Sequence, residues 1–277
     1  MLDRLIFDIG MHEARDTEFY LKKGFRVVAV EADSDFVGPV KTRLREYAES
    51  GQLVIENLAI AELEGEVKFY KNDLKTDWGT ISLKFVARNI GRNAPHRQIT
   101  VRATTLDKLI SKYGTPYYLK IDIEGADYLC LSQLKRTAER PKYVSIETSL
   151  DLDRFDGFFS EVSLLWELGY RKFKVVNQDL NDFVKCPNPP LEGVFVDTHF
   201  NGFSSGPFGE EAPGRWMGIE ETIVLYRRIL ADQRLFGPEG MIGKTFPGKL
   251  FRHFRKHILR SPVGWYDLHA SLPAEKC

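Results

Sequence analysis

Short apolar runs alternate with amphipathic stretches along the first two thirds of the chain. Residues 5–7 and 26–30 are rich in β-branched and aromatic side chains, as in short strands buried on both faces. Between them, Asp16 resembles a helix start and Gly24 a helix end. The pattern predicts a β-strand, a helix and a second strand over residues 5–33.

The alternation continues to about residue 177. Strands separated by helices predict an α/β fold with a mostly parallel sheet and helices on both faces. Residues 71–97 are polar and rich in turn formers, so a long loop is expected there. Further strands are predicted at 53–55, 66–70, 99–102, 116–121, 143–146, 171–176 and 193–198, and helices at 35–50, 105–113, 126–136, 158–168, 219–235 and 249–260.

Composition narrows the classes of function. Lys plus Arg and Asp plus Glu are both 39 among 277 residues, and this balance argues against a general nucleic-acid binder. No apolar run reaches the roughly 18 residues of a membrane span, and the first strand leaves no room for a signal peptide. The three cysteines lack metal-type spacing. We therefore expect a cytoplasmic protein without a nucleic-acid or membrane partner; the sequence leaves the oligomeric state open.

Polar side chains follow the predicted strands at the points where these end. Ligands bind at the carboxyl ends of strands in open parallel sheets, so these residues are candidates for a site. Each has an alternative interpretation, as the cap of the helix that follows it. The residues are Asp8, Glu31, Asn57, Asp122, Glu124, Glu147 and Asn177.

The turn after the first strand distinguishes between cofactors. A dinucleotide site needs three glycines in this turn, but only Gly10 is present, and Glu13 would repel a pyrophosphate. S-adenosylmethionine, which has an amino-acid end and no phosphate, suits the turn better. Asp8 would shape the turn and face the ammonium group. Glu31 would accept from the ribose hydroxyls, at close to the usual spacing of about 20 residues.

Two motifs carry a family resemblance. Asp8-Ile9-Gly10 through Thr17 is similar to D-x-G-A-N-x-G-x-x-T, and 105–107 leading to 119–126 is similar to T-L-D…K-I-D-V-E-G-A-E. Over residues 5–180 the sequence resembles the FkbM-type S-adenosylmethionine-dependent O-methyltransferases. The resemblance implies the Rossmann-like class I methyltransferase fold with a seven-stranded sheet. The cofactor-binding residues expected from the turn, the strand ends and the motifs are Asp8, Gly10, Met11, His12, Thr17, Glu31, Ala32, Asn57 and Asp122.

The chain departs from the family pattern at the turn. Met11 and His12 replace Ala-Asn, Ala14 replaces the second Gly, and Asp127 replaces the final Glu. A Cβ at residue 14 would narrow the turn and weaken cofactor binding.

Transfer of a methyl group to an alcohol needs a base that removes the hydroxyl proton, in addition to the bound cofactor. The candidate catalytic residues are His12, Asp122, Glu124 and Glu147, and His12 has the most suitable intrinsic pKa. In the alternative interpretation, His12 only hydrogen-bonds within the turn and Glu124 caps its helix. A metal-dependent variant would use oxygen ligands from Asp122, Glu147 and Asn177 to bind Mg²⁺.

The domain prediction separates a cofactor-binding domain, residues 1–200, from an irregular C-terminal extension, 201–277, that would act as a lid or acceptor-binding segment. The expected acceptor is a small molecule, a saccharide or a natural-product intermediate. Residues 249–260 are basic and amphipathic, typical of a solvated helix face or of a contact with an acidic partner. The competing functions are a scaffold on a degenerate methyltransferase fold and an NAD(P)-dependent oxidoreductase.

Overall fold

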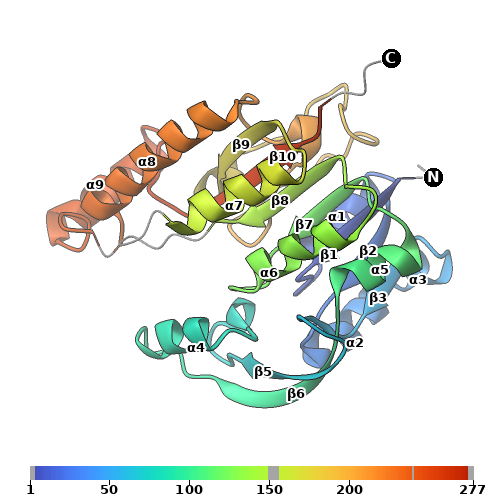
Figure 1. Ribbon diagram of the computed structural model, residues 1–277. Coiled ribbons are helices and arrows are strands. Elements are labelled where there is room, and N and C mark those ends of the chain that lie inside the picture. Colours follow the sequence, from blue (N-terminus) through green and yellow to red (C-terminus); the bar gives the residue numbers. More distant parts are fainter. Residues whose placement is uncertain (1–3, 149–155, 239, 274–277) are drawn as a thin grey trace. The chain divides into compact units, whose positions relative to one another are not determined.

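A seven-stranded, mostly parallel sheet organises the chain in the computed structural model, which describes residues 4–148, 156–238 and 240–273. The strand order is β3-β2-β1-β7-β8-β10-β9, and β10 pairs antiparallel to β9. This arrangement confirms the predicted α/β class. The chain divides into two compact units, Met1–Val144 and Ser145–Cys277, which we describe separately (Figure 1).

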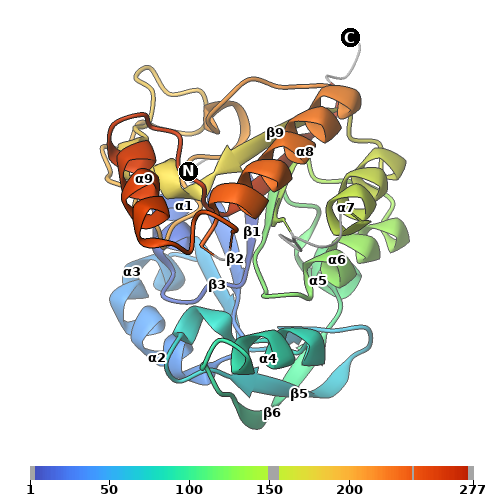
Figure 2. The ribbon, with the colours of Figure 1, turned by 90° about the vertical axis from the view of Figure 1, so that its left-hand side faces the viewer.

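The first unit contains four parallel strands of the large sheet and a second, three-stranded sheet of order β4-β6-β5. Figure 2 shows α4 beside β5 and β6. The elements of this unit are β1 (Leu5–Ile9), α1 (Arg15–Lys22), β2 (Arg26–Val30), α2 (Ser34–Arg43), α3 (Arg45–Glu49), β3 (Leu53–Glu56), β4 (Ala59–Ile60), β5 (Gly65–Lys71), η1 (Thr76–Trp78), α4 (Leu83–Ile90), β6 (Arg97–Thr104), α5 (Leu106–Tyr113), β7 (Tyr118–Ile121), α6 (Asp127–Ser132) and η2 (Gln133–Arg136).

The second unit contributes the remaining strands, with β8 crossing the boundary between the units. Its helix α8 packs on β9, and the Tyr226 ring stacks on Phe158 of α7 with centroids 3.5 Å apart. The elements are β8 (Tyr143–Glu147), α7 (Asp156–Glu167), β9 (Lys172–Asn177), η3 (Gln178–Phe183), η4 (Gly209–Glu211), α8 (Ile219–Phe236), α9 (Phe246–His257) and β10 (Tyr266–Ser271).

Three element predictions were wrong. The expected loop at 71–97 contains η1 and α4, because its glycines and proline bound a helix instead of preventing one. The expected helix at 35–50 is broken at Leu44, whose φ is −103°. Residues 193–198 form no strand; the turn just before them is fixed by the Glu211 carboxylate, which accepts from the N–H groups of Leu191 and Glu192.

The last strand is β10, which lies within the predicted C-terminal extension. It pairs with β9 along its whole length, from Tyr266 opposite Asn177 to Ser271 opposite Lys172. The extension therefore contributes one strand to the large sheet. The domain division at residue 200 stays a prediction.

Candidate functional site

The turn after β1 packs so tightly that only glycine fits at its first position. Gly10 has φ +93°, and a Cβ there would lie 1.8 Å from the main-chain oxygen of Asp122. The N–H groups of Gly10 and Met11 both donate to the Val30 carbonyl, at 3.0 and 2.9 Å. The turn is thus fixed against the ends of both neighbouring strands, β2 and β7.

Three residues other than glycine adopt left-handed backbone around this turn: His12, Ala14 and Glu124, with φ of 48°, 61° and 46°. Such conformations cost free energy and persist where the surroundings impose them, frequently at functional sites. Ala14 is fully buried and precedes the first turn of α1. The chain therefore keeps the left-handed conformation at the position where the family pattern has its second glycine.

A buried ion cluster lies beneath the turn. The register of the parallel strands places Lys120 directly beside Asp8, and Lys120 Nζ is 3.2 Å from the Asp8 carboxylate. Asp16 and Asp122 lie 3.4 and 3.5 Å from the same Nζ. Thr17 donates to the second oxygen of Asp8 at 2.5 Å. The carboxylates that surround Lys120 raise its pKa well above the ordinary value, although burial opposes this.

Asp8 and Thr17 were predicted to bind the cofactor, and both side chains are completely buried. Since Thr17 and Lys120 bond the two Asp8 oxygens, Asp8 supports the turn from within the fold. Asp122 differs, because 43% of its side chain is exposed. Asp122 therefore presents the accessible carboxylate of this cluster.

Glu31 follows β2 and is held by the main chain alone. Its two carboxylate oxygens accept from the N–H groups of His12 and Asp33, both at 2.7 Å. No cation pairs with it among the described residues. Burial raises the pKa of Glu31 to about 7, against the opposing effect of these two hydrogen bonds. An uncompensated carboxylate at this place can accept hydrogen bonds from two adjacent hydroxyl groups.

The remaining predicted cofactor residues lie around Glu31. The Asn57 amide donates to the carbonyls of Glu31 and Ala32, at 2.8 and 3.3 Å, and so fixes the end of β2. The His12 ring packs against the Phe36 ring at a tilt of 53°, with centroids 4.3 Å apart, and its Nε2 lies 3.0 Å from the Thr76 hydroxyl. Burial lowers the pKa of His12, which favours the neutral ring needed in a base.

The loop after β7 carries two more carboxylates. Asp127 accepts from the N–H groups of Ile123 and Gly125, at 3.0 and 2.9 Å, and burial raises its pKa to about 6. Burial also raises the pKa of Glu124 to about 8, and Arg88 of α4 lies 3.1 Å from its carboxylate. Asp127 thus fixes the loop that precedes α6, and no side chain among the described residues caps the start of that helix, so the alternative interpretation of Glu124 as a helix cap gains no support.

A segment that the sequence predicted to be a loop covers the loop after β7. We call residues 72–96, which include η1 and α4, the cap segment. Thr80 donates to the Glu124 carbonyl at 2.6 Å, and a Cβ at Gly125 would lie 2.3 Å from the Phe85 ring. The Arg88 guanidinium also lies over that ring, 4.0 Å from its centroid. The apolar residues of α4 were the only sequence signal for this element.

In the second unit, Glu147 ends β8 and is half-buried, and Asn177 ends β9. The Asn177 oxygen accepts from the Asp179 N–H at 3.1 Å, and its amide donates to Pro262 and Tyr266. Asn177 therefore caps η3. No group of three or more His, Cys, Asp or Glu side chains is arranged to hold a metal ion in the parts of the chain described above. The magnesium alternative gains no support.

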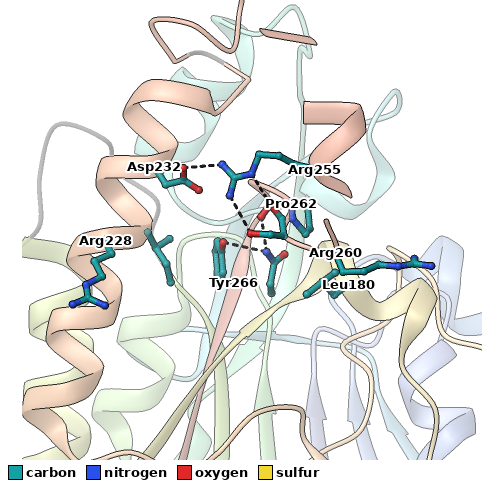
Figure 3. Close-up of a pocket in the computed structure, with 10 residues that line it drawn as sticks. Leu180, Arg228, Asp232, Arg255, Arg260, Pro262 and Tyr266 are labelled. Atoms are coloured by element: carbon teal, nitrogen blue, oxygen red, sulfur yellow. Dashed lines mark hydrogen bonds and ion pairs between the residues drawn. The ribbon is translucent and has the colours of Figure 1, made fainter. Parts of the chain in front are cut away.

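An open pocket of about 470 Å³ lies beside Asn177 in the second unit (Figure 3). Arg255 pairs there with Asp232 at 2.7 Å, while the side chains of Arg228 and Arg260 extend away from this pair. The lining is therefore basic overall.

The strand order, the Gly10 turn and the acidic end of β2 define the Rossmann-like fold of class I methyltransferases. The family model of the methyltransferase FkbM domain matches residues 8–172. The chain belongs to the FkbM methyltransferase family, which confirms the resemblance inferred from its two motifs.

Comparison with solved structures gives distant similarities. The FkbM methyltransferase of Methylobacillus flagellatus is 15% identical with a TM-score of 0.43, over 62% of this chain and 40% of that chain. A putative sarcosine dimethylglycine methyltransferase from Galdieria sulphuraria is 9% identical with a TM-score of 0.39, over 97% and 77%. The chain thus spans 40% of the length of the first structure. No curated protein matches the sequence significantly.

A bilayer-spanning helix is absent from the described residues, where no helix is both long and apolar enough.

Proposed function

We propose that the chain is an S-adenosylmethionine-dependent O-methyltransferase that acts on a hydroxyl group of a small molecule, a saccharide or a natural-product intermediate. The observation that carries the proposal is the Glu31 carboxylate, which is buried, lacks a cationic partner among the described residues and lies beside the Gly10 turn. It suits the two hydroxyls of a ribose. S-adenosylmethionine supplies an activated methyl group, so the protein mainly has to position the reactants.

The residues divide the remaining tasks. Gly10 and Met11 form the turn that would receive the amino-acid end, and the accessible Asp122 carboxylate lies where it would face the ammonium group or accept the acceptor proton. His12 and Glu124 are further candidates for the base, and Glu147 stays a candidate from the second unit. Among these, His12 is favoured by its lowered pKa and its position at the turn.

Calorimetric titration with S-adenosylmethionine, S-adenosylhomocysteine and NAD tests the proposal. We expect micromolar binding of the two adenosyl compounds and none of NAD. Incubation of the labelled cofactor with a panel of hydroxylated acceptors, followed by mass spectrometry, would then identify the methylated oxygen. Binding of NAD alone would favour the oxidoreductase.

The scaffold alternative is favoured by one observation, the Ala14 methyl group buried at a left-handed position in the turn. If no adenosyl compound binds at millimolar concentration, the scaffold function replaces the enzyme. Restored binding in Ala14→Gly would show that this methyl group closes the site.

A further inference from the structure

The segment 240–260 is the most basic part of the chain. It contains six lysines and arginines and no acidic residue, although the whole chain has a net charge of zero. Helix α9 occupies most of this segment. A local excess of positive charge of this kind attracts an anionic partner.

Helix α9 turns its charged side toward the protein. Arg255 lies 2.7 Å from Asp232 of α8, and Lys256 lies 3.7 and 3.6 Å from Asp179 and Asp182. Gly248, on the same side, is buried. The acidic residues of the second unit therefore hold the helix by its basic face.

The apolar side of α9 consequently faces solvent. Phe246, Leu250, Phe254 and Ile258 are spaced by four residues and so form one stripe along the helix. Their exposed fractions are 75%, 59%, 45% and 66%. Met241 and Leu259 extend the exposed apolar surface at the two ends. An exposed stripe of this size on a soluble domain marks an interaction surface.

Cations border the stripe. Lys244, Lys249 and Arg260 are exposed, and no acidic side chain pairs with them among the described residues. Arg228 extends outward from the neighbouring pocket (Figure 3). Large apolar side chains flanked by lysines and arginines that lack acidic partners are the pattern of helices that lie in the interface of an anionic bilayer.

We propose that α9 and its flanking residues bind the chain to the surface of an anionic lipid membrane. The apolar stripe enters the interface between headgroups and acyl chains, and the bordering cations contact lipid phosphates and carboxylates. Charge complementarity selects this occupant, since exposed Lys244, Lys249 and Arg260 border the stripe and residues 240–260 contain no carboxylate side chain. Such peripheral binding does not need a spanning helix.

Sedimentation of the full chain with sucrose-loaded vesicles tests this proposal without any assay of activity. We expect binding to vesicles of phosphatidylcholine and phosphatidylserine in a 7:3 ratio that is at least tenfold stronger than binding to phosphatidylcholine alone. Raising the salt concentration should weaken it, because exposed charges are screened.

Two variants separate the apolar and electrostatic parts. Leu250→Glu combined with Phe254→Glu should reduce binding at least tenfold. Lys249→Gln should reduce it about fivefold, the contribution of one cation near an anionic surface. Leu63→Glu is the matched control, since Leu63 is 72% exposed in the other unit, and its binding should equal that of the unchanged chain.

Equal sedimentation of the unchanged chain and the double variant would overturn the proposal. Failure of the unchanged chain to bind anionic vesicles would overturn it as well. Light scattering identifies a different occupant. If the unchanged chain is a dimer that the double variant dissociates, and vesicles are not bound, then a second copy covers the stripe and the membrane proposal is wrong.

Discussion

Two buried carboxylates at the ends of neighbouring strands differ in whether a cation balances their charge. Asp8 lies beside a buried lysine and accepts from Thr17, so its charge is balanced within the fold. Glu31 accepts from two main-chain N–H groups and has no cationic partner among the described residues. The difference separates a structural ion pair from a carboxylate that we propose binds the cofactor.

The largest effect is expected from Lys120→Met. It leaves Asp8 and Asp16 buried beside each other without their cation, and removing one partner of a buried ion pair costs about 3–5 kcal/mol. The free energy of unfolding, measured with urea, checks this. Lys112→Met is the control: Lys112 pairs with Glu56 at 2.6 Å but is exposed, so its loss should cost below about 1 kcal/mol. Equal losses in the two variants would refute the structural role of Lys120.

Glu31→Gln, in contrast to Lys120→Met, should reduce ligand affinity and leave stability intact. It keeps an oxygen for one N–H group but removes the charge, so stability at pH 8 should not fall. Affinity for S-adenosylhomocysteine should fall by about 1–3 kcal/mol, the contribution of hydrogen bonds to a charged group. Calorimetry and urea unfolding measure the two quantities on the same preparation. Unchanged affinity would remove Glu31 from the cofactor site.

Because the pKa of Glu31 is raised, both the stability of the fold and its affinity for a ribose ligand should depend on pH. The Glu31 pKa is raised from 4.5 to about 7, so the folded chain holds this proton more tightly than the unfolded chain does. The resulting stabilisation is complete below pH 4.5 and is lost as pH rises to about 7. Ligand hydroxyls prefer the carboxylate, so affinity should change in the reverse direction and rise by roughly tenfold from pH 6 to pH 8.

Adenosine is the suitable ligand for this measurement, because it keeps the ribose hydroxyls and lacks the titrating amino-acid end. Glu31→Gln should flatten the profile. A profile that persists in this variant would point to another group, and His12 is the nearest candidate.

The sequence alone predicted the features that local patterns determine. The apolar runs located β1, β2 and β7, and the break at Gly10 located the turn between β1 and α1. The spacing to Glu31 indicated a ligand-binding carboxylate, and the structure places that residue beside the turn. Its role in binding stays a prediction.

Long-range features were missed for a physical reason. Lys120 interrupts an apolar strand, but only the register of β1 and β7 shows that it faces Asp8. Likewise, the packing of Phe85 and Arg88 over the loop after β7 depends on tertiary contacts. The register and partner of β10 also depend on contacts far apart in the sequence.

Glu124 is intermediate between Asp8 and Glu31. It has a cationic partner, Arg88, but this partner belongs to the cap segment. Arg88→Ala should cost only about 1 kcal/mol, because the Arg88 side chain is about one-third exposed. It should also raise the pKa of Glu124 further. Hydrogen exchange should accelerate within residues 72–96 and remain unchanged in β1. Exchange that accelerates equally in both regions would indicate global destabilisation and not local release of the cap segment.

The smallest effect is expected from Ala14→Gly. Relief of the left-handed backbone strain should raise the free energy of unfolding by about 1–2 kcal/mol. Loss of a buried methyl group should lower it by about 0.8 kcal/mol, and the greater freedom of glycine in the unfolded chain should lower it by a further ~0.5–1 kcal/mol. These contributions nearly cancel, so the free energy of unfolding should change by less than about 1 kcal/mol. Affinity for S-adenosylhomocysteine should rise if the methyl group narrows the turn. Lower affinity with unchanged stability would mean that Ala14 contacts the ligand, and the turn would then be a variant suited to its cofactor and not a weakened one.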